Sequence, residues 1–171
     1  MKGAHILRSL TFFRLGAILV TAILTAGPAQ ADILAVVISE QGLQYDVSPS
    51  NYDNSPSNYD NSSSNYDNSA SNYDNSVSNY DNSASNYDNG PSGKRSVVTE
   101  DGKRVGYYVF SKKGVLNFYH AGKRIFYMPG GGKTQSVFGS DGSMWCGTLG
   151  KMNGNLVLGL TRNCMLQMLM D

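Results

Sequence analysis

The sequence contains few of the residues from which catalytic and metal sites are usually built. Among 171 residues there are two histidines, two cysteines and one tryptophan. His120 lies in an aromatic stretch, where a single histidine is more typical of a structural role than of a general base. One such histidine and two cysteines do not complete a tetrahedral zinc site. We therefore expect no metal, no cofactor and no enzymatic activity, and a small hydrolase is the least favoured of three possible functions.

The chain also lacks an apolar run long enough to cross a membrane as a helix. The apolar run at residues 15–27 rises only about 20 Å, against a hydrocarbon core of about 30 Å. Basic residues precede this run, and Ala29 and Ala31 follow it in the A-x-A pattern that a signal peptidase recognises. These features predict a signal peptide that is cleaved after Ala31. We expect an exported protein, periplasmic, on the cell surface or extracellular, with no transmembrane segment after processing.

Lysine and arginine are absent from residues 32–91, which carry nine acidic side chains. Residues 92–171 carry eleven basic and four acidic side chains. The formal net charge of +1 therefore conceals one segment at −9 and another at +7, and the remaining positive charge lies in the first 31 residues. This asymmetry predicts a molecule in two parts, an acidic segment and a basic domain.

The acidic segment is a tandem repeat. Six copies of a heptapeptide that begins SNYDN cover residues 50–91, and a degenerate copy, LQYDVSP, covers residues 43–49. The closing residue of the six copies is Pro, Ser, Ala, Val, Ala or Pro, so this position accepts side chains of different size. Every copy keeps a tyrosine that is followed by an aspartate. The tyrosines are Tyr45, Tyr52, Tyr59, Tyr66, Tyr73, Tyr80 and Tyr87.

The repeat period matches neither a coiled coil nor a single strand. A coiled-coil heptad needs two apolar positions per unit, and an odd period sends successive tyrosines to opposite faces of a strand. In a β-solenoid, ordering seven residues costs roughly 7–14 kcal/mol, whereas burying one tyrosine gains on the order of 2–3 kcal/mol. The sequence thus favours a flexible, disordered spacer over a solenoid, with self-association through the tyrosines as an alternative. We expect deletion of residues 57–70 to change the melting temperature of the C-terminal domain little.

The C-terminal part alternates short β-rich segments with turns that contain glycine. This pattern predicts a mainly β fold, a small antiparallel β-meander preceded by the flexible repeat segment. The apolar residues 33–39 are expected to pair on an edge of this sheet or to begin the mature domain. The chain then divides into a signal peptide (1–31), an N-terminal strand (32–42), repeats (43–91) and a basic β domain (92–171). The clearest strands are expected at residues 96–99, 105–111, 115–120 and 124–128.

Residues 130–134, GGGKT, look like the end of a phosphate-binding loop. Such a loop also requires a glycine five residues before its last glycine, and that position is Tyr127 here. Strand and turn signals follow the segment, so no helix N-terminus would face a phosphate. We therefore do not expect nucleotide binding.

Cys146 and Cys164 are the only cysteines of the chain. In an exported domain of about eighty residues, such a pair predicts a disulfide. Closing a loop of this length should stabilise the fold by about 3 kcal/mol. Two reduced and buried thiols are the alternative.

The basic residues of the β domain occur largely in pairs at the expected turns. Alternate turns of a meander share one end of the sheet, so these pairs would gather into clusters with little acid nearby. Such clusters predict binding of a polyanion, such as an acidic polysaccharide, lipid head groups or nucleic acid. The charge pattern is equally compatible with two further roles: the pairs serve solubility, or the acidic segment folds back and neutralises them. The candidate residues for polyanion binding are Lys103, Arg104, Lys112, Lys113, Lys123 and Arg124.

The tandem SNYDNS units, followed by GYYVFSKKGVLNFYHAGKRIFYMP at residues 106–129, resemble short exported proteins of Gram-negative bacteria that carry this repeat. The resemblance covers nearly the whole mature chain, and it implies export and layout without assigning functional residues. The sequence as a whole favours an exported, non-enzymatic protein whose basic β domain binds a polyanionic component of the envelope. The alternative is a structural, self-assembling repeat protein of the envelope or matrix.

Overall fold

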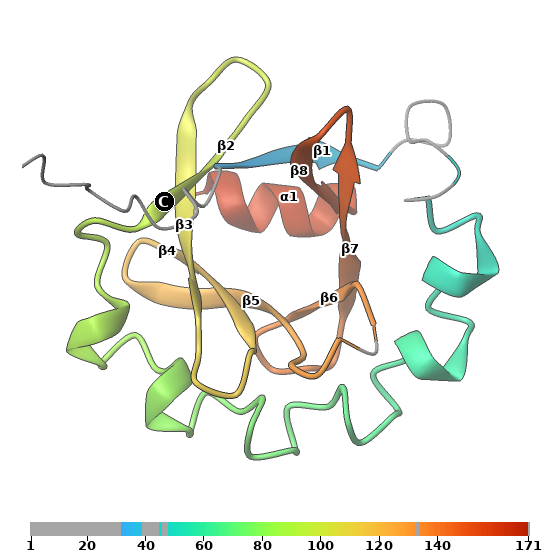
Figure 1. The fold of residues 1–171 in the computed structure, drawn as a ribbon, viewed down its shortest axis with the longest axis horizontal. Helices are drawn as coiled ribbons and strands as arrows, with labels where there is room; N and C mark the ends of the chain where they lie inside the picture. Colours follow the sequence, from blue (N-terminus) through green and yellow to red (C-terminus); the bar gives the residue numbers. More distant parts are fainter. Residues whose placement is uncertain (1–31, 39–44, 46–47, 133, 171) are drawn as a thin grey trace, which may run out of the picture.

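The computed structural model describes residues 32–38, 45, 48–132 and 134–170, and the predicted signal peptide lies outside these residues. The described chain is mainly β, as the sequence predicts, with one α-helix and several short 3-10 turns. Its strands form a single closed barrel, and the repeats wrap around this barrel (Figure 1). None of the helices in the described part of the chain combines the length and hydrophobicity of a membrane span.

The predicted meander forms most of the barrel wall. Each strand from β2 to β7 pairs antiparallel with the next strand in sequence. The turns between the first of these strands contain Gly102, Gly114 and Gly122, all with positive φ, as the glycine pattern of the turns predicts. The strands are β2 (Arg95–Val98), β3 (Arg104–Phe110), β4 (Leu116–His120), β5 (Lys123–Met128), β6 (Ser136–Gly139), β7 (Trp145–Met152) and β8 (Asn155–Leu160).

The remaining strand, β1 (Ile33–Val37), closes the barrel. It pairs in parallel with β2 on one side and with β8 on the other. The predicted pairing of this segment with the sheet is therefore present, and it joins the two edges of the meander. Two parallel strands cannot be joined by a tight turn, because the chain must return to the end where it started. The repeats lie between β1 and β2 in sequence. They therefore form the crossover connection of this parallel pair.

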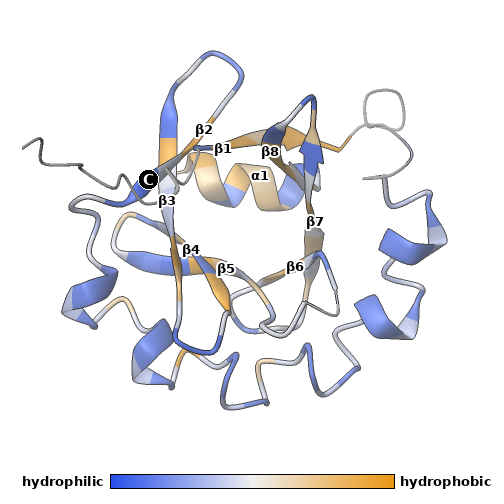
Figure 2. Ribbon diagram, in the orientation of Figure 1, coloured by the Kyte–Doolittle hydropathy of each residue, from blue (hydrophilic) through white to orange (hydrophobic). Residues whose placement is uncertain are grey.

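Apolar residues are concentrated in the strands and in the helix, whereas the repeats are mostly hydrophilic (Figure 2). One continuous cluster takes buried side chains from all eight strands and from α1 (Arg162–Leu169). Thr161 begins the helix, and its hydroxyl oxygen accepts a hydrogen bond from the backbone N–H of Cys164 at 3.4 Å. The predicted disulfide between Cys146 and Cys164 is present and joins β7 to α1, with 5.6 Å between the Cα atoms. The helix is thus fixed to the barrel by a covalent bond as well as by packing.

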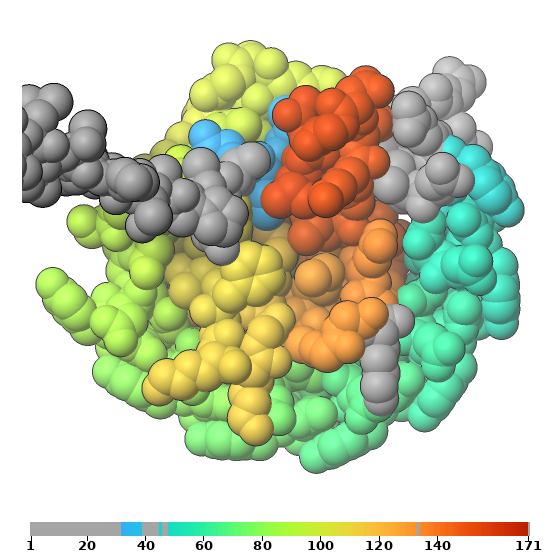
Figure 3. All heavy atoms as spheres, viewed as in Figure 1, coloured from blue at the N-terminus to red at the C-terminus, as the bar shows by residue number. Residues whose placement is uncertain are grey.

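The repeats are ordered, which corrects the prediction of a flexible spacer. Residues 48–91, here called the belt, form a continuous band around the barrel (Figures 1 and 3). They consist of turns and contain no strand, so they are not a β-solenoid either. The units at Tyr66 and Tyr73 make the same backbone bonds as the four units with an assigned 3-10 turn. Those turns are η2 (Tyr52–Asn54), η3 (Tyr59–Asn61), η4 (Tyr80–Asn82) and η5 (Tyr87–Asn89).

The physical reason for this order lies in the asparagines. A flexible spacer is expected if the only gain that offsets the free-energy cost of ordering each unit is the burial of one tyrosine. In the structure the tyrosines are exposed, whereas the asparagine in fifth place of the unit is buried in successive copies. Asn61, Asn68, Asn75 and Asn82 are each at most 3% exposed. Hydrogen bonds of these amides hold the belt in place, together with an apolar contact of Ala70 with the buried cluster of Val115, Tyr127 and Phe138.

Candidate interaction surface on the repeat belt

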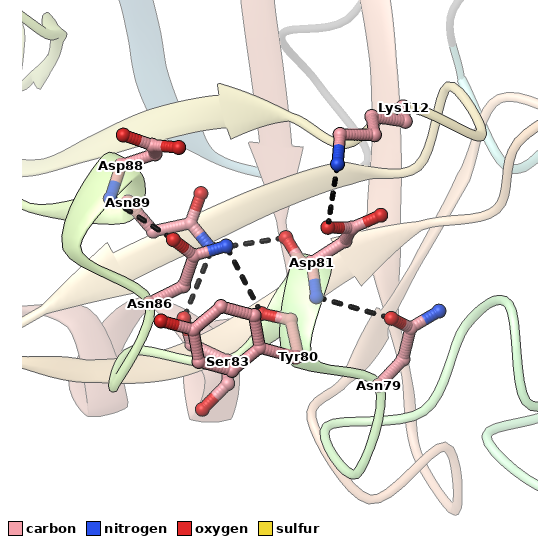
Figure 4. Close-up of polar contacts among 8 residues, drawn as sticks. All are labelled: Asn79, Tyr80, Asp81, Ser83, Asn86, Asp88, Asn89 and Lys112. Carbon is pink, nitrogen blue, oxygen red and sulfur yellow. Dashed lines mark hydrogen bonds and ion pairs between the residues drawn. The ribbon is translucent and has the colours of Figure 1, made fainter.

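Each unit of the belt folds through two short side-chain caps. In the fifth copy the second residue, Asn79, has an extended backbone, and its side-chain oxygen accepts a hydrogen bond from the backbone N–H of Asp81 at 3.0 Å. This Asx turn begins the 3-10 turn Tyr80–Asn82 (Figure 4). The sixth residue, Ser83, forms the matching cap with the backbone N–H of Ser85 at 3.1 Å. These caps explain why asparagine and serine recur at the two positions.

The fifth residue of each unit links it to the unit before. The side-chain amide of Asn82 donates to the backbone oxygen of Asp74 at 2.7 Å and to that of Ser76 at 3.0 Å. The same two bonds recur from Asn61 to Asn89. Both hydrogens of the buried amide are used in this way. Since each such bond is worth about 1 kcal/mol net, order in one unit favours order in the next.

The barrel binds four consecutive units through this same fifth residue. The hydrogen-bond donors lie on β4, on β5 and in the segment before β6. A donor that comes later in the sequence binds a unit that comes earlier. Each donates to an oxygen of the asparagine, whose own amide hydrogens already serve the belt. The spacing of the donors on the barrel therefore matches the period of the repeat. The pairs are Thr134–Asn61 (2.6 Å), Tyr127–Asn68 (2.6 Å), Arg124–Asn75 (2.8 Å) and Tyr119–Asn82 (2.8 Å).

Arg124 is the charged member of this set and is 7% exposed. Its guanidinium also donates to the side-chain oxygen of Asn117 at 2.9 Å and to two oxygens of Ser140 at 3.2 and 3.1 Å. It lies 4.8 Å from the ring centroid of Tyr127. Burial away from water lowers the pKa of Arg124 to about 10 and raises the pKa of Tyr127 to about 12. The sequence predicts that Arg124 binds a polyanion, but the residue is enclosed between barrel and belt.

Lys112 and Lys113, two further candidates for polyanion binding, face the belt. They lie in the turn between β3 and β4, and their ammonium groups are 3.6 Å from a carboxylate oxygen of Asp81 and 3.9 Å from one of Asp74. Figure 4 shows Lys112 above Asp81. The acidic segment thus folds back on the basic domain, as one of the three interpretations of the charge pattern predicts. The pairs are largely exposed, so each contributes at most about 1 kcal/mol.

Lys103, Arg104 and Lys123 are the candidates that remain exposed. They lie in or beside the β2–β3 and β4–β5 turns, which share an end of the meander. The six predicted residues therefore do not form one site. Three of them lie at one end of the barrel wall, two pair with the belt, and one is buried.

The described residues bring together no group of three histidine, cysteine, aspartate or glutamate side chains that could hold a metal ion. The ring nitrogen Nδ1 of His120 lies 2.7 Å from the backbone oxygen of Val105 on the neighbouring strand. This contact fits the structural role that the sequence predicts for His120.

The outer face of the belt presents the tyrosines. Tyr52 to Tyr80 are each 60–64% exposed, whereas Tyr87, which no unit follows, is 93% exposed. Each tyrosine that a further unit follows is thus about a third less exposed than Tyr87. An aspartate that is exposed or half-buried comes next after each belt tyrosine. We call this face the ridge, and it consists of Tyr52, Asp53, Tyr59, Asp60, Tyr66, Asp67, Tyr73, Asp74, Tyr80, Asp81, Tyr87 and Asp88.

Sequence reasoning missed the residues that fix the belt, namely the fifth asparagine and its partners on the barrel. A signal for the asparagine was present. The closing residue changes from copy to copy, whereas an amide recurs in fifth place in all six. A short polar unit that keeps an amide indicates hydrogen-bonded order as well as solubility. The partners Thr134, Tyr127 and Tyr119 carry no comparable signal, because each occurs once.

The chain was compared with models of known protein families, with curated proteins and with solved structures, and no match was found. The ridge is consequently interpreted from its own geometry and charge.

Proposed function

We propose that the protein is an exported, non-catalytic interaction protein, and that the ridge binds an extended carbohydrate polymer. The observation that carries this proposal is the nearly equal exposure of the tyrosines from Tyr52 to Tyr80, which lie in turns of the same backbone geometry. A series of equivalent binding positions suits a ligand that is itself a repeating chain. The disulfide between Cys146 and Cys164 supports export, because such bonds persist in oxidising compartments.

Tyrosine suits this ligand because its ring has an apolar face and its hydroxyl forms hydrogen bonds. The apolar faces of sugar rings stack on such a surface, and sugar hydroxyls donate to neighbouring carboxylates. The structural hydrogen bonds of the unit come from asparagine, serine and backbone, which leaves the ring to meet a ligand. The fixed backbone also lowers the entropy that binding would cost.

The polyanion function predicted from the sequence is the less favoured proposal. Of its six candidate residues, Arg124 is buried, and Lys112 and Lys113 face carboxylates of the belt. Only the three exposed bases at the β2–β3 and β4–β5 turns could serve it. Self-association through the tyrosines is a further alternative, but two acidic ridges repel each other at low ionic strength.

The test is affinity electrophoresis of the chain from Asp32 in native gels that contain hydroxyethylcellulose, a soluble β-glucan or glycol chitosan. We expect at least one polymer to retard the protein. The double variant Tyr66→Ser, Tyr73→Ser should lose most of this retardation. Val77→Ala, which trims an exposed apolar residue of the belt outside the ridge, is the matched control and should behave as the unmodified protein.

The proposal fails if none of these polymers retards the unmodified protein, or if the tyrosine variant is retarded equally. Retardation by heparin that Lys103→Ala and Lys123→Ala abolish would instead favour the polyanion function. A molecular mass in solution that rises with concentration, and no longer does so in the tyrosine variant, would favour self-association.

A further inference from the structure

We propose that the polymer bound by the ridge is cationic, a linear polysaccharide of amino sugars that carry free ammonium groups. This inference rests on the proposed function and adds the ligand's charge to it. It follows from the aspartate beside every tyrosine, from the absence of basic residues in the belt, and from the lysines that the ridge already contacts.

The charge of the ridge selects among carbohydrate polymers. Residues 32–91 contain no lysine or arginine, so no cation within the belt offsets its aspartates. Among the described residues, Asp53, Asp60 and Asp88 are exposed and take part in no ion pair. A row of carboxylates repels acidic polysaccharides and nucleic acids, and it attracts a chain with spaced positive charges. A neutral chain would gain hydrogen bonds from these carboxylates but no Coulomb attraction.

The geometry places ring and carboxylate together in each unit. Tyrosine and aspartate are consecutive residues of one 3-10 turn, so their side chains leave the turn about 120° apart. The Asx cap fixes the backbone N–H of each aspartate, as Asn51 does for Asp53 and Asn58 for Asp60. An aromatic surface and an anionic group therefore recur in the same relation along the belt. An amino sugar offers the matching pair, a ring face and an ammonium group.

The protein itself shows how an ammonium group meets the ridge. The Nζ atom of Lys112 lies 3.6 Å from the carboxylate of Asp81, which follows Tyr80 (Figure 4). That of Lys113 lies 3.9 Å from the carboxylate of Asp74. A hollow of about 300 Å³ opens at this point, and Tyr80, Asp88 and Lys112 contribute to its lining. These lysines are primary ammonium ions on flexible stems, as the ligand's groups would be. Both are more than half exposed, so a bound chain can displace them.

The experiment compares glycol chitosan with the same polymer after complete N-acetylation, which removes the ammonium groups and keeps the chain. Binding to the chain from Asp32 is measured by calorimetry at low salt, at a pH below the pKa of the glucosamine amine. We expect glycol chitosan to bind at least tenfold more tightly than the acetylated polymer. This preference should disappear as the pH rises through the pKa of the amine, and also in high salt.

Two variants locate the effect. Asp53→Asn, Asp60→Asn and Asp88→Asn together keep the shape of the ridge and remove three carboxylates that make no described ion pair. We expect this triple variant to bind glycol chitosan roughly tenfold more weakly, with binding of the acetylated polymer unchanged. Glu100→Gln, which removes an exposed carboxylate from the β2–β3 turn, is the control and should bind as the unmodified protein does.

The outcomes separate this inference from the function on which it rests. Equal binding of the two polymers, with loss of both in Tyr66→Ser, Tyr73→Ser, would overturn the cationic ligand and leave carbohydrate binding in place. Binding of neither polymer would overturn both. An unchanged affinity of the triple aspartate variant, or an equal loss in Glu100→Gln, would show that the ridge carboxylates do not recognise the ammonium groups.

Discussion

The belt and the barrel reach an ordered structure by opposite physical means. The barrel buries a continuous apolar cluster and is joined to its helix by the Cys146–Cys164 disulfide. The belt buries asparagines and exposes its aromatic residues. It is held by amide hydrogen bonds between units and by five side-chain donors on the barrel, because Asn117 also donates to Asn82. The difference shows that a sequence with little apolar content can still be ordered when a folded neighbour satisfies its polar groups.

The two regions also differ in what determines their register. A barrel strand that shifts by one residue turns its core side chains outward, so its register is strictly determined. Successive units of the belt are chemically equivalent, and the donors of the barrel determine which unit lies where. The belt is further constrained at both ends, because β1 and β2 are parallel neighbours in the same barrel. Its length is therefore part of the fold.

The largest effect is expected from shortening the belt. Deletion of residues 57–70 removes the two units that Thr134 and Tyr127 bind, and the remaining chain must still pass around the barrel from β1 to β2. We expect the shortened protein to be unfolded under conditions in which the unmodified protein is folded. Circular dichroism on heating should then show no cooperative transition. This is the opposite of what a flexible spacer predicts.

The control for the deletion keeps the length of the belt and changes two closing residues, Ser63→Ala and Ala84→Ser. It should melt within a few degrees of the unmodified protein, since surface changes of this kind cost at most about 0.5 kcal/mol. If the deletion variant melted at the same temperature as the control, the belt would be a separable spacer after all.

The next effect is expected from a single amide. Asn68→Asp replaces two hydrogen-bond donors by a carboxylate that faces the backbone oxygens of Asp60 and Ser62. We expect a loss of about 3 kcal/mol in the free energy of unfolding, since a charge would be buried among acceptors. Urea unfolding near neutral pH measures it. The loss should shrink as the pH falls, because a protonated carboxyl can donate again.

Asp60→Asn makes the reverse exchange of the same two residue types at an exposed position of the belt. It should change the free energy of unfolding by less than about 0.5 kcal/mol. Equal effects of the two variants would mean that the inner and outer faces of the belt are held in the same way.

The contrast between belt and barrel also determines which parts of the structure can be predicted from the sequence. Alternating β-rich segments and glycine turns predict the meander, because both signals are local. The pairing of β1 with two strands is not local, since the partners Val97 and Leu156 of Ile33 lie far along the chain. The order of the belt does not follow from its composition, because donors that hold it belong to the barrel. The ridge residues are visible as a repeat, but their common orientation depends on that order.

A smaller effect is expected from alkaline pH. Burial raises the pKa of Tyr127 to about 12 and raises that of Tyr119 as well. In the unfolded chain both phenols ionise near pH 10, so their contribution to stability is present below that pH and falls as the pH rises toward the folded pKa. Arg124 acts in the opposite direction, because its folded pKa of about 10 lies below its unfolded value. Burial also raises the pKa of Tyr107 and that of Tyr108. Four tyrosines against one arginine therefore leave a net loss of stability.

Urea unfolding at a series of pH values above about 9 measures this loss. Tyr127→Phe should reduce the slope, and at neutral pH it should cost about 1 kcal/mol because the hydrogen bond to Asn68 is missing. Phe126→Leu, which alters the apolar cluster without removing a phenol, is the control and should leave the slope unchanged. A slope that Tyr127→Phe leaves unchanged would contradict a role for this contact in the alkaline response.

The smallest effect is expected on the outer face of the belt. Tyr66 and Tyr73 are more than 60% exposed. We expect Tyr66→Ser and Tyr73→Ser each to lower the free energy of unfolding by no more than about 0.5 kcal/mol, measured by urea unfolding at neutral pH. A loss comparable to that of Asn68→Asp would mean that the tyrosines help to hold the belt and are not reserved for a ligand. If the loss is small, folding does not explain why a tyrosine recurs in every copy of the repeat. Recurrence without a role in stability is expected of a surface that binds a ligand.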